Sequence, residues 1–391
     1  MIMRLSLKGR YNIWQLFQLV LLFLMSLNFK NLYFYFIFAS FFVCMAANFR
    51  SLRADLASFF LLVLSVSYVI FDSSARNAIT TLLKQFAYPM CYLTGLNLYN
   101  GDEQKTLSES DLNRRIKVSI LIVAMGTFLH YLLNASINFE SLTRNTADYW
   151  TGEVVSATGQ ALLAVLPLGI FSAWLVGEVP TWRKWLSLIG LLVIFAYNFV
   201  LAGRTILILE VVIVSVAFIY TQRKTNLLGG IRNQMFLALV FLGVLILFLN
   251  NAFGVQEWVL DSNLIARFDT ESALQDIRLN RKLIYMSRML DFPFGGGALM
   301  ASVGGHAHEL YLDIYSDVGI LGYAAVIAAV LTCTINVIRS TRIRPLSVET
   351  KSLLLCVFLG VNVVFFLEPI LQGSPWLFCI FCYLSGVLHG L

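Results

Sequence analysis

Two histidines and two arginines are the residues of this sequence best suited to chemistry. His306 and His308 share a glycine-rich segment, and a histidine can accept a proton near neutral pH. Arg204 and Arg278 carry planar guanidinium groups, which can bind phosphate oxygens through two parallel hydrogen bonds. A metal on the two histidines would need further ligands, and neither a cysteine nor a convincing carboxylate cluster supplies them. The favoured chemistry is proton transfer to a histidine beside a bound anion.

More cations follow Arg278 along the chain. Arg278 and Lys282 are four residues apart, so they would share one face of a helix. For Arg281, Lys282 and Arg288, the simpler interpretation is a basic interfacial helix that rests on lipid headgroups. Arg204 could likewise be a snorkelling anchor at the membrane surface. We favour an anion site there, because the positive-inside bias disfavours an arginine at that boundary.

The elements that must position these residues are membrane helices. Of the 391 residues, 59% are apolar and 13% are charged, whereas soluble domains have about 45–50% and about 25%. This composition excludes a soluble globular enzyme, and the 14% of aromatic residues excludes disorder. About twelve stretches approach the roughly 20 apolar residues that a spanning helix needs, which predicts an all-α polytopic membrane protein. They run near 13–28, 33–48, 55–72, 77–97, 117–133, 157–177, 184–202, 204–220, 234–250, 319–338, 352–367 and 374–390.

The basic residues predict the orientation of these helices. Most of the 28 lysines and arginines fall in alternate loops, and such loops are cytoplasmic under the positive-inside rule. Both termini are then cytoplasmic, and no small-residue cleavage site follows the first apolar stretch, which is therefore read as a retained helix. The net charge of +6 is a topology signal on this interpretation, and nucleic-acid binding is not expected.

The candidate residues gather in the loops on the outer side. We interpret 1–391 as one integral membrane domain, with short outside loops, a longer one at 134–156 and by far the longest at 251–318. The longest loop contains an amphipathic helical stretch at 273–290, a turn at 293–297 and then both candidate histidines. Function is expected on this face.

The cysteines and the two remaining histidines are predicted to have packing roles. All six cysteines fall inside predicted spans, so no disulfide framework is expected in the outside loops. Cys379 and Cys382 have the spacing of a redox or metal motif, but they stand in an apolar helix, which favours packing. His130 and His389 lie in or at the ends of predicted spans and are interpreted in the same way.

The histidine segment resembles a motif of the O-antigen ligases and the related Wzy-type polysaccharide polymerases. His308-Glu309, nine residues and then 319–322 (Gly-Ile-Leu-Gly) resemble the family's histidine, amide or serine, nine-residue spacer and G-x-x-G. Glu309 departs from that pattern. Arg278 stands fifteen residues before Pro293, and 293–295 resembles the family's Pro-x-Gly approach to the same loop.

Two further segments resemble the same family. The triplet 203–205 (Gly-Arg-Thr) is similar to the family's arginine at the start of a mid-chain helix, and Arg144 followed by 157–159 (Ala-Thr-Gly) is similar to an earlier, looser element. The matches cover about 144–322, whereas the N-terminal third matches only in hydropathy. Their order, sidedness and spacing carry the resemblance.

The resemblance implies a GT-C-like membrane glycosyltransferase of the bacterial inner membrane, with its active site on the periplasmic face. The donor would be a glycan on undecaprenyl diphosphate, and no metal or other cofactor is expected. His308 would be the general base, and Arg204 and Arg278 would bind the diphosphate. The implied substrate-binding residues are Arg144, Arg267, Arg281, Glu309 and Tyr311. The implied partners are a glycan or lipid A-core acceptor, a chain-length regulator and the bilayer.

Two alternatives remain open at this point. Within the family, a polymerase that joins repeat units is favoured over a ligase that transfers the finished glycan to lipid A-core, but the motifs serve both. Outside it, a flippase or transporter of lipid-linked glycans is the competing class. Transporters usually hold their charges near the midplane, whereas the candidate charges here cluster at one face.

The predicted orientation can be tested by cysteine labelling. Cysteines at Asn145 and Ser262, one in each longer outside loop, should react with a membrane-impermeant thiol reagent in intact cells whose outer membrane has been permeabilised. Labelling that occurs only after the inner membrane is lysed would reverse the orientation and the side of the site.

Overall fold

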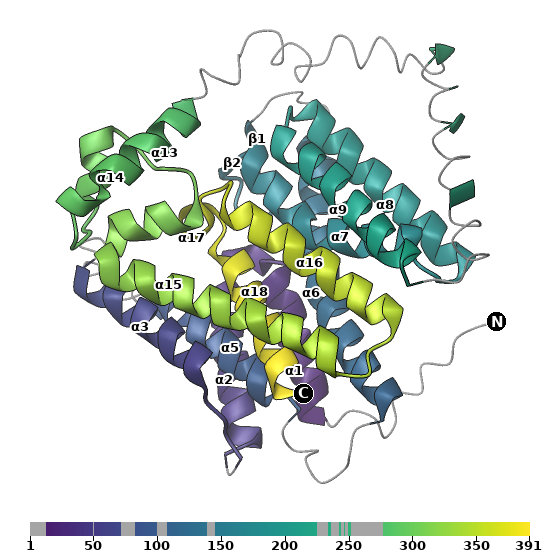
Figure 1. Cartoon of the computed structure of the whole chain (residues 1–391), viewed down its shortest axis with the longest axis horizontal. Coiled ribbons are helices and arrows are strands. Elements are labelled where there is room, and N and C mark those ends of the chain that lie inside the picture. Colours follow the sequence, from purple (N-terminus) through teal and green to yellow (C-terminus); the bar gives the residue numbers. More distant parts are fainter. Residues whose placement is uncertain are drawn as a thin grey trace.

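The computed structural model describes residues 13–49, 51–71, 83–99, 108–138, 145–224, 234–235, 242–243, 246, 249–251 and 277–391. Over these residues the chain is almost entirely helical (Figure 1). The helices are α1 (Ile13–Ser26), α2 (Tyr33–Ala47), α3 (Leu56–Phe71), α5 (Ala87–Asn97), α6 (Glu109–Asn138), α7 (Ala157–Val176), α8 (Thr181–Val200), α9 (Arg204–Gln222), α13 (Ile277–Arg288), α14 (Ala298–Val303), α15 (Leu310–Ile343), α16 (Val348–Phe365), α17 (Ile370–Gly373) and α18 (Pro375–Gly390).

The helices confirm a helical membrane protein. Six of those described are long and apolar enough to cross a membrane, namely α6, α7, α8, α9, α15 and α16. Four shorter apolar helices accompany them, namely α1, α2, α3 and α18. A described helix lies at every predicted stretch except 234–250, most of which lies outside the described residues. Twelve spans, the GT-C-like architecture and the periplasmic side of the site stay predictions.

One segment predicted as a loop has local structure of its own within the all-α fold. The segment predicted as a loop at 134–156 contains the end of α6 and an antiparallel hairpin of β1 (Asn145–Ala147) and β2 (Val154–Ser156). Asp148 closes the hairpin turn, because its Oδ1 atom accepts hydrogen bonds from the backbone N–H groups of Trp150 and Thr151. Strands of three residues are too short for an alternating pattern to predict them.

The start of the tenth predicted span also differs from the structure. The apolar stretch begins near 319, but α15 begins at Leu310 and continues through a break at Gly319, where φ is 72° and ψ is −165°. The predicted long loop therefore ends nine residues earlier, directly after His308-Glu309. Since α15 runs from this point to Ile343, the histidine segment is anchored on a long helix.

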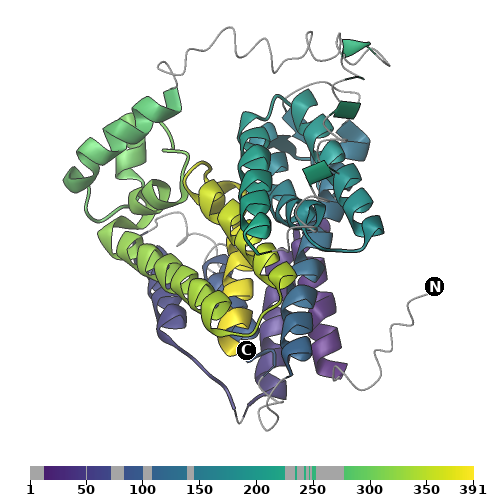
Figure 2. The ribbon, with the colours of Figure 1, turned by 45° about the vertical axis from the view of Figure 1, so that its right-hand side comes forward.

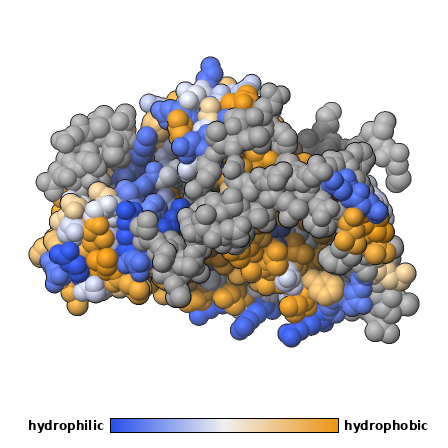
Figure 3. Space-filling view, turned by 90° about the horizontal axis from the view of Figure 1, so that it is seen from above, coloured by the Kyte–Doolittle hydropathy of each residue, from blue (hydrophilic) through white to orange (hydrophobic). Residues whose placement is uncertain are grey.

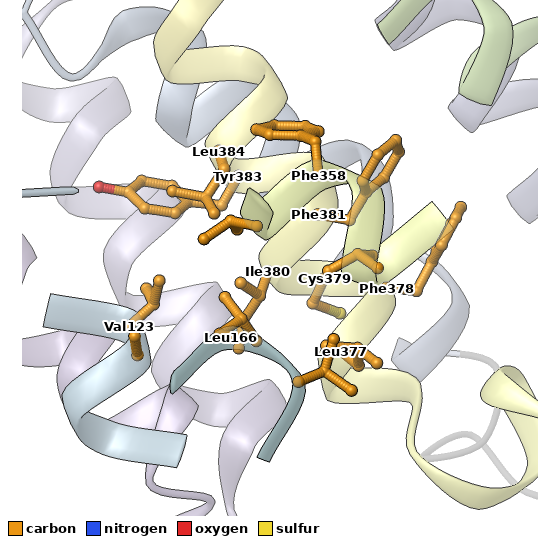
Figure 4. Packing of buried hydrophobic residues seen from close by; sticks show 14 of the residues in the cluster. Val123, Leu166, Phe358, Leu377, Phe378, Cys379, Ile380, Phe381, Tyr383 and Leu384 are labelled. Atoms are coloured by element: carbon orange, nitrogen blue, oxygen red, sulfur yellow. The ribbon is translucent and has the colours of Figure 1, made fainter. Parts of the chain in front are cut away.

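The core of the bundle forms around α18. This helix is apolar on all sides, as expected for a helix buried by its neighbours, and residues 376–388 of it are all buried. Figure 4 shows Phe378, Cys379 and Phe381 of α18 among apolar side chains of the helices that surround it. Both Cys379 and Cys382 are fully buried there, which agrees with packing. Gly386 allows a close approach to α5, because a Cβ atom at that position would lie 2.1 Å from the carbonyl oxygen of Tyr92.

The short helices α13 and α14 lie beyond one end of the bundle. Figures 1 and 2 both show them above the first turns of α15, on the side where α17 lies. The loop between α14 and α15 carries His306 and His308. Helices separated widely in sequence therefore meet at this end, and the candidate site is built there.

Candidate functional site

His308 stands in a strained turn held by a buried carboxylate. Its φ is 61°, in the left-handed region that residues other than glycine rarely adopt. Asp313, on the first turn of α15, has no exposed side-chain surface. Its two oxygens accept hydrogen bonds from the N–H of Ala307 at 2.8 Å and the N–H of Glu309 at 3.1 Å. Since these donors flank His308, Asp313 fixes the backbone on both sides of the candidate base.

The surroundings of His308 keep its imidazole neutral. Burial and the positive charges of Arg278 and Arg281, together with His306 and Lys282, lower the pKa of His308 to about 4. At neutral pH the ring is therefore unprotonated. A neutral imidazole can accept a proton, whereas an imidazolium cannot.

Helix α13 turns three cations toward this turn. The guanidinium of Arg281 lies against Gly305, where a Cβ atom would come within 3.0 Å of its Nη1 atom. The ammonium of Lys282 pairs with the Glu309 carboxylate at 3.2 Å and donates a hydrogen bond of 2.8 Å to the Phe366 carbonyl oxygen. The third cation, Arg278, faces Glu368, which follows Phe366 by two residues. The side chains of Arg281 and Lys282 therefore contact protein groups, which the interpretation as headgroup contacts did not include.

The buried partner of Arg278 is Glu368, which sequence reasoning missed. The Glu368 side chain is 1% exposed, and its Oε2 atom lies 3.6 Å from Nη1 of Arg278. Its Oε1 atom accepts a 3.0 Å hydrogen bond from the hydroxyl of Thr205. Burial raises the pKa of Glu368, and the Arg278 charge opposes that shift. One carboxylate thus connects α13 to the first turn of α9.

Arg204 stands next to Thr205 as the first residue of α9. It is half-buried, and the chain reaches it through a turn in which the Gly203 N–H donates to the Asn198 carbonyl oxygen at 2.9 Å. The left-handed residue of this turn is Ala202, with a φ of 53°, and not Gly203. A glycine can allow a close approach of backbone or ligand. Its nearest neighbour is instead Asn198, whose Oδ1 atom would lie 3.2 Å from an added Cβ.

The two glycine motifs of the resemblance pack against each other. The Ile320 N–H donates to the Pro293 carbonyl oxygen at 2.9 Å. Gly295 and Gly319 both have φ of 72°, and a Cβ atom on Gly295 would lie 2.4 Å from the Gly319 nitrogen. The break in α15 at Gly319 therefore makes room for the turn that follows α13, and the two segments hold each other in place.

The other predicted residues differ in their outcome. Arg144 and Arg267 lie outside the described residues. Tyr311 was predicted to bind substrate, but it is only 9% exposed. Its ring packs on Phe366 at a centroid distance of 4.9 Å. It therefore supports the residue whose carbonyl oxygen accepts a hydrogen bond from Lys282. Arg288 lies away from this cluster, 3.9 Å from Asp291 and against the Phe292 ring.

The remaining histidines pair with carboxylates. His306 lies 3.8 Å from Asp313. The buried His130 bonds Asp148 at 2.8 Å, and His389 pairs with Asp55. The packing interpretation of His130 and His389 therefore omitted a polar contact with a carboxylate for each ring. Within the described part of the chain, no three His, Cys, Asp or Glu side chains are grouped so as to hold a metal ion.

Comparisons with known proteins add no family to this description. No protein-family model and no curated protein matches the chain. The family resemblance therefore stays a prediction that rests on the motif residues, and the site has to be interpreted from its own geometry.

The role of Asp313 can be tested without a functional assay. Asp313→Ala removes a buried carboxylate that accepts two backbone hydrogen bonds. The two N–H groups lose their acceptor, so the substitution should destabilise the protein by about 1–3 kcal/mol. Thermal unfolding in detergent should show a lower midpoint than the wild type. Asp291→Ala is the matched control, since that side chain is 65% exposed and its midpoint should not move. Equal midpoints for the two variants would mean that Asp313 does not hold the His308 turn.

Proposed function

We propose that this protein is a membrane glycosyltransferase. It would transfer a glycan from undecaprenyl diphosphate to a sugar hydroxyl, most simply joining repeat units of a surface polysaccharide. The observation that carries the proposal is the neutral His308 beside Arg278, Arg281 and Lys282 at one end of a helical membrane bundle. Such a site offers a base and a set of anion-binding groups at one end of the bundle.

The proposed reaction uses each group in a defined way. The acceptor hydroxyl attacks the anomeric carbon of the donor, and its proton passes to the neutral ring of His308. The bond from that carbon to the lipid diphosphate breaks, and the leaving group gains negative charge. Arginine guanidinium groups stabilise that charge strongly in a site shielded from water.

Glu368 supports this interpretation as a counter-ion for Arg278. A buried carboxylate keeps the guanidinium oriented before the donor arrives, at a distance of 3.6 Å that is longer than a hydrogen bond. A diphosphate carries more negative charge than one carboxylate and offers more oxygens. We expect Arg278 to bind the diphosphate with its other N–H groups while Glu368 stays its counter-ion.

The position of the cations also bears on the competing class. Transport of a lipid-linked glycan would call for charges near the middle of the bundle. Helix α13, which carries these cations, lies instead beyond the end of the bundle, near the first turns of α15 (Figure 2). This arrangement favours chemistry at a membrane surface over transport.

The proposal is tested by incubating purified protein with an undecaprenyl-linked repeat unit. A ladder of lengthened glycans without lipid A-core would support a polymerase, and transfer only after lipid A-core is added would support a ligase. Movement of intact donor across a vesicle bilayer without any transfer would contradict both and favour a transporter.

His308→Ala should reduce the rate of transfer about 10²–10⁴-fold, the usual cost of losing a general base. His306→Ala is the control and should cost much less, because His306 faces Asp313. The measurement is turnover at matched protein level. Near-wild-type turnover by His308→Ala would exclude it as the base, and equal losses restored by Zn²⁺ would favour a metal site.

The pH dependence of transfer should reflect the lowered pKa of His308, about 4. Because the neutral ring is the active form, the rate should not fall as the pH drops from about 7 to about 5. Arg281→Gln removes a neighbouring positive charge, which should raise the pKa and move the acidic loss of activity to higher pH. Arg288→Gln should leave the profile in place. An acidic limb at the ordinary histidine pKa in the wild type would contradict this account.

Arg204→Lys and Arg278→Lys should each lose turnover of the lipid-diphosphate donor while expression stays normal. A lysine keeps the charge but loses the planar fork that binds two phosphate oxygens. Arg288→Lys, which changes an arginine outside the cluster, should be nearly silent. If both lysine variants turn over the donor like the wild type, bidentate recognition of the diphosphate is wrong. Positions 204 and 278 would then need only a positive charge.

A further inference from the structure

Helix α13 presents its apolar residues to the outside. Leu279, Leu283 and Met286 of α13, with Leu290 in the 3-10 turn that directly follows it (Met289–Asp291), recur at helical spacing along one stripe, and their exposed fractions run from 48% to 78%. We call these four residues the α13 stripe. A short helix on a water-soluble surface would turn such a stripe inward, so its exposure requires an apolar partner.

The face of α13 next to the stripe is already occupied by protein. Arg278, Arg281 and Lys282 lie on that face and are half-buried, and Tyr285 beside them is fully buried. The Tyr285 hydroxyl donates a 2.7 Å hydrogen bond to the Gly305 carbonyl oxygen, next to the histidine turn. The helix therefore cannot rotate to bury its stripe without breaking the contacts that build the site.

The α13 stripe continues into the apolar surface of the membrane helices. The chain leaves α13 through Phe294, which is 72% exposed and stacks on Phe71 at the end of α3 with 6.5 Å between ring centroids. Two more apolar side chains are exposed on the membrane helices, Ile70 next to Phe71 on α3 and Ile320 on α15. In the view from above, hydrophobic and hydrophilic side chains lie next to each other on the left, the side on which Figure 1 places α13 and α14 (Figure 3).

We propose that α13 is an in-plane membrane helix, with the α13 stripe docked on lipid acyl chains of the leaflet at this end of the bundle. A helix of 12 residues is about 18 Å long, too short to cross a bilayer but suited to lie along its surface. Continuity with the apolar surfaces of α3 and α15 identifies the occupant as lipid. The docking would press the basic face of α13 toward the His308 turn and Glu368.

The docking can be measured by site-directed spin labelling in liposomes of phosphatidylethanolamine and phosphatidylglycerol. The six native cysteines are all buried, so single cysteines introduced at exposed positions should label selectively. Leu283→Cys and Leu290→Cys report from the stripe. Ser287→Cys is the matched control, because Ser287 is an exposed residue of the same helix that lies outside the stripe.

Collisions with oxygen, which dissolves in lipid, and with a water-soluble nickel chelate distinguish the possible surroundings. Labels on the stripe should favour oxygen by several-fold, and the label at Ser287 should favour nickel. Strong nickel collisions at both stripe positions would show that the stripe faces water. Weak collisions with both reagents there would show that protein covers it, either a second copy or another segment of this chain. Either result would overturn lipid docking, and neither depends on the proposed enzymatic reaction.

Discussion

A buried carboxylate determines how this end of the protein is assembled. Removing a charge from water costs several kcal/mol unless partners compensate it, and the Glu368 side chain is almost fully buried. Its partners come from two other elements, Thr205 at the start of α9 and Arg278 on α13. The cost of leaving Glu368 unpaired therefore ties a helix of the bundle to the short helix beyond it, which brings Arg204 and the α13 cations to the same end.

The histidine turn depends on a second buried carboxylate and on backbone contact between glycines. Asp313 holds the donors on both sides of His308, and the meeting of Gly295 with Gly319 fixes the turn after α13 against α15. Substitution of either glycine would push the two backbones apart. This packing also buries His308 and holds the cations of α13 near it, and both effects lower the pKa of His308.

The sequence predicts the positions of the membrane helices and of α13 well, because long apolar runs and helical periodicity are local signals. It also identifies His308, Arg278 and Arg281 as residues that meet. It does not predict Glu368, since a glutamate just after an apolar stretch is ordinarily solvated and no local pattern marks it as buried. The sequence also does not predict that the apolar stripe of α13 faces outward, for a related reason. Periodicity shows that a helix has two faces, but only tertiary contacts decide which face meets the protein.

The central claim is that α9, α13, the chain after α16 and the histidine turn form one site for a lipid diphosphate. Photo-crosslinking with an undecaprenyl-diphosphate glycan, carrying a photoreactive group beside the diphosphate, tests it most directly. Mass spectrometry should locate the adducts near Arg204, Arg278, His308 and Glu368, and excess unlabelled donor should remove them. Specific adducts at the opposite end of the bundle, around Asp55 and His389, with none near Arg278, would contradict the account.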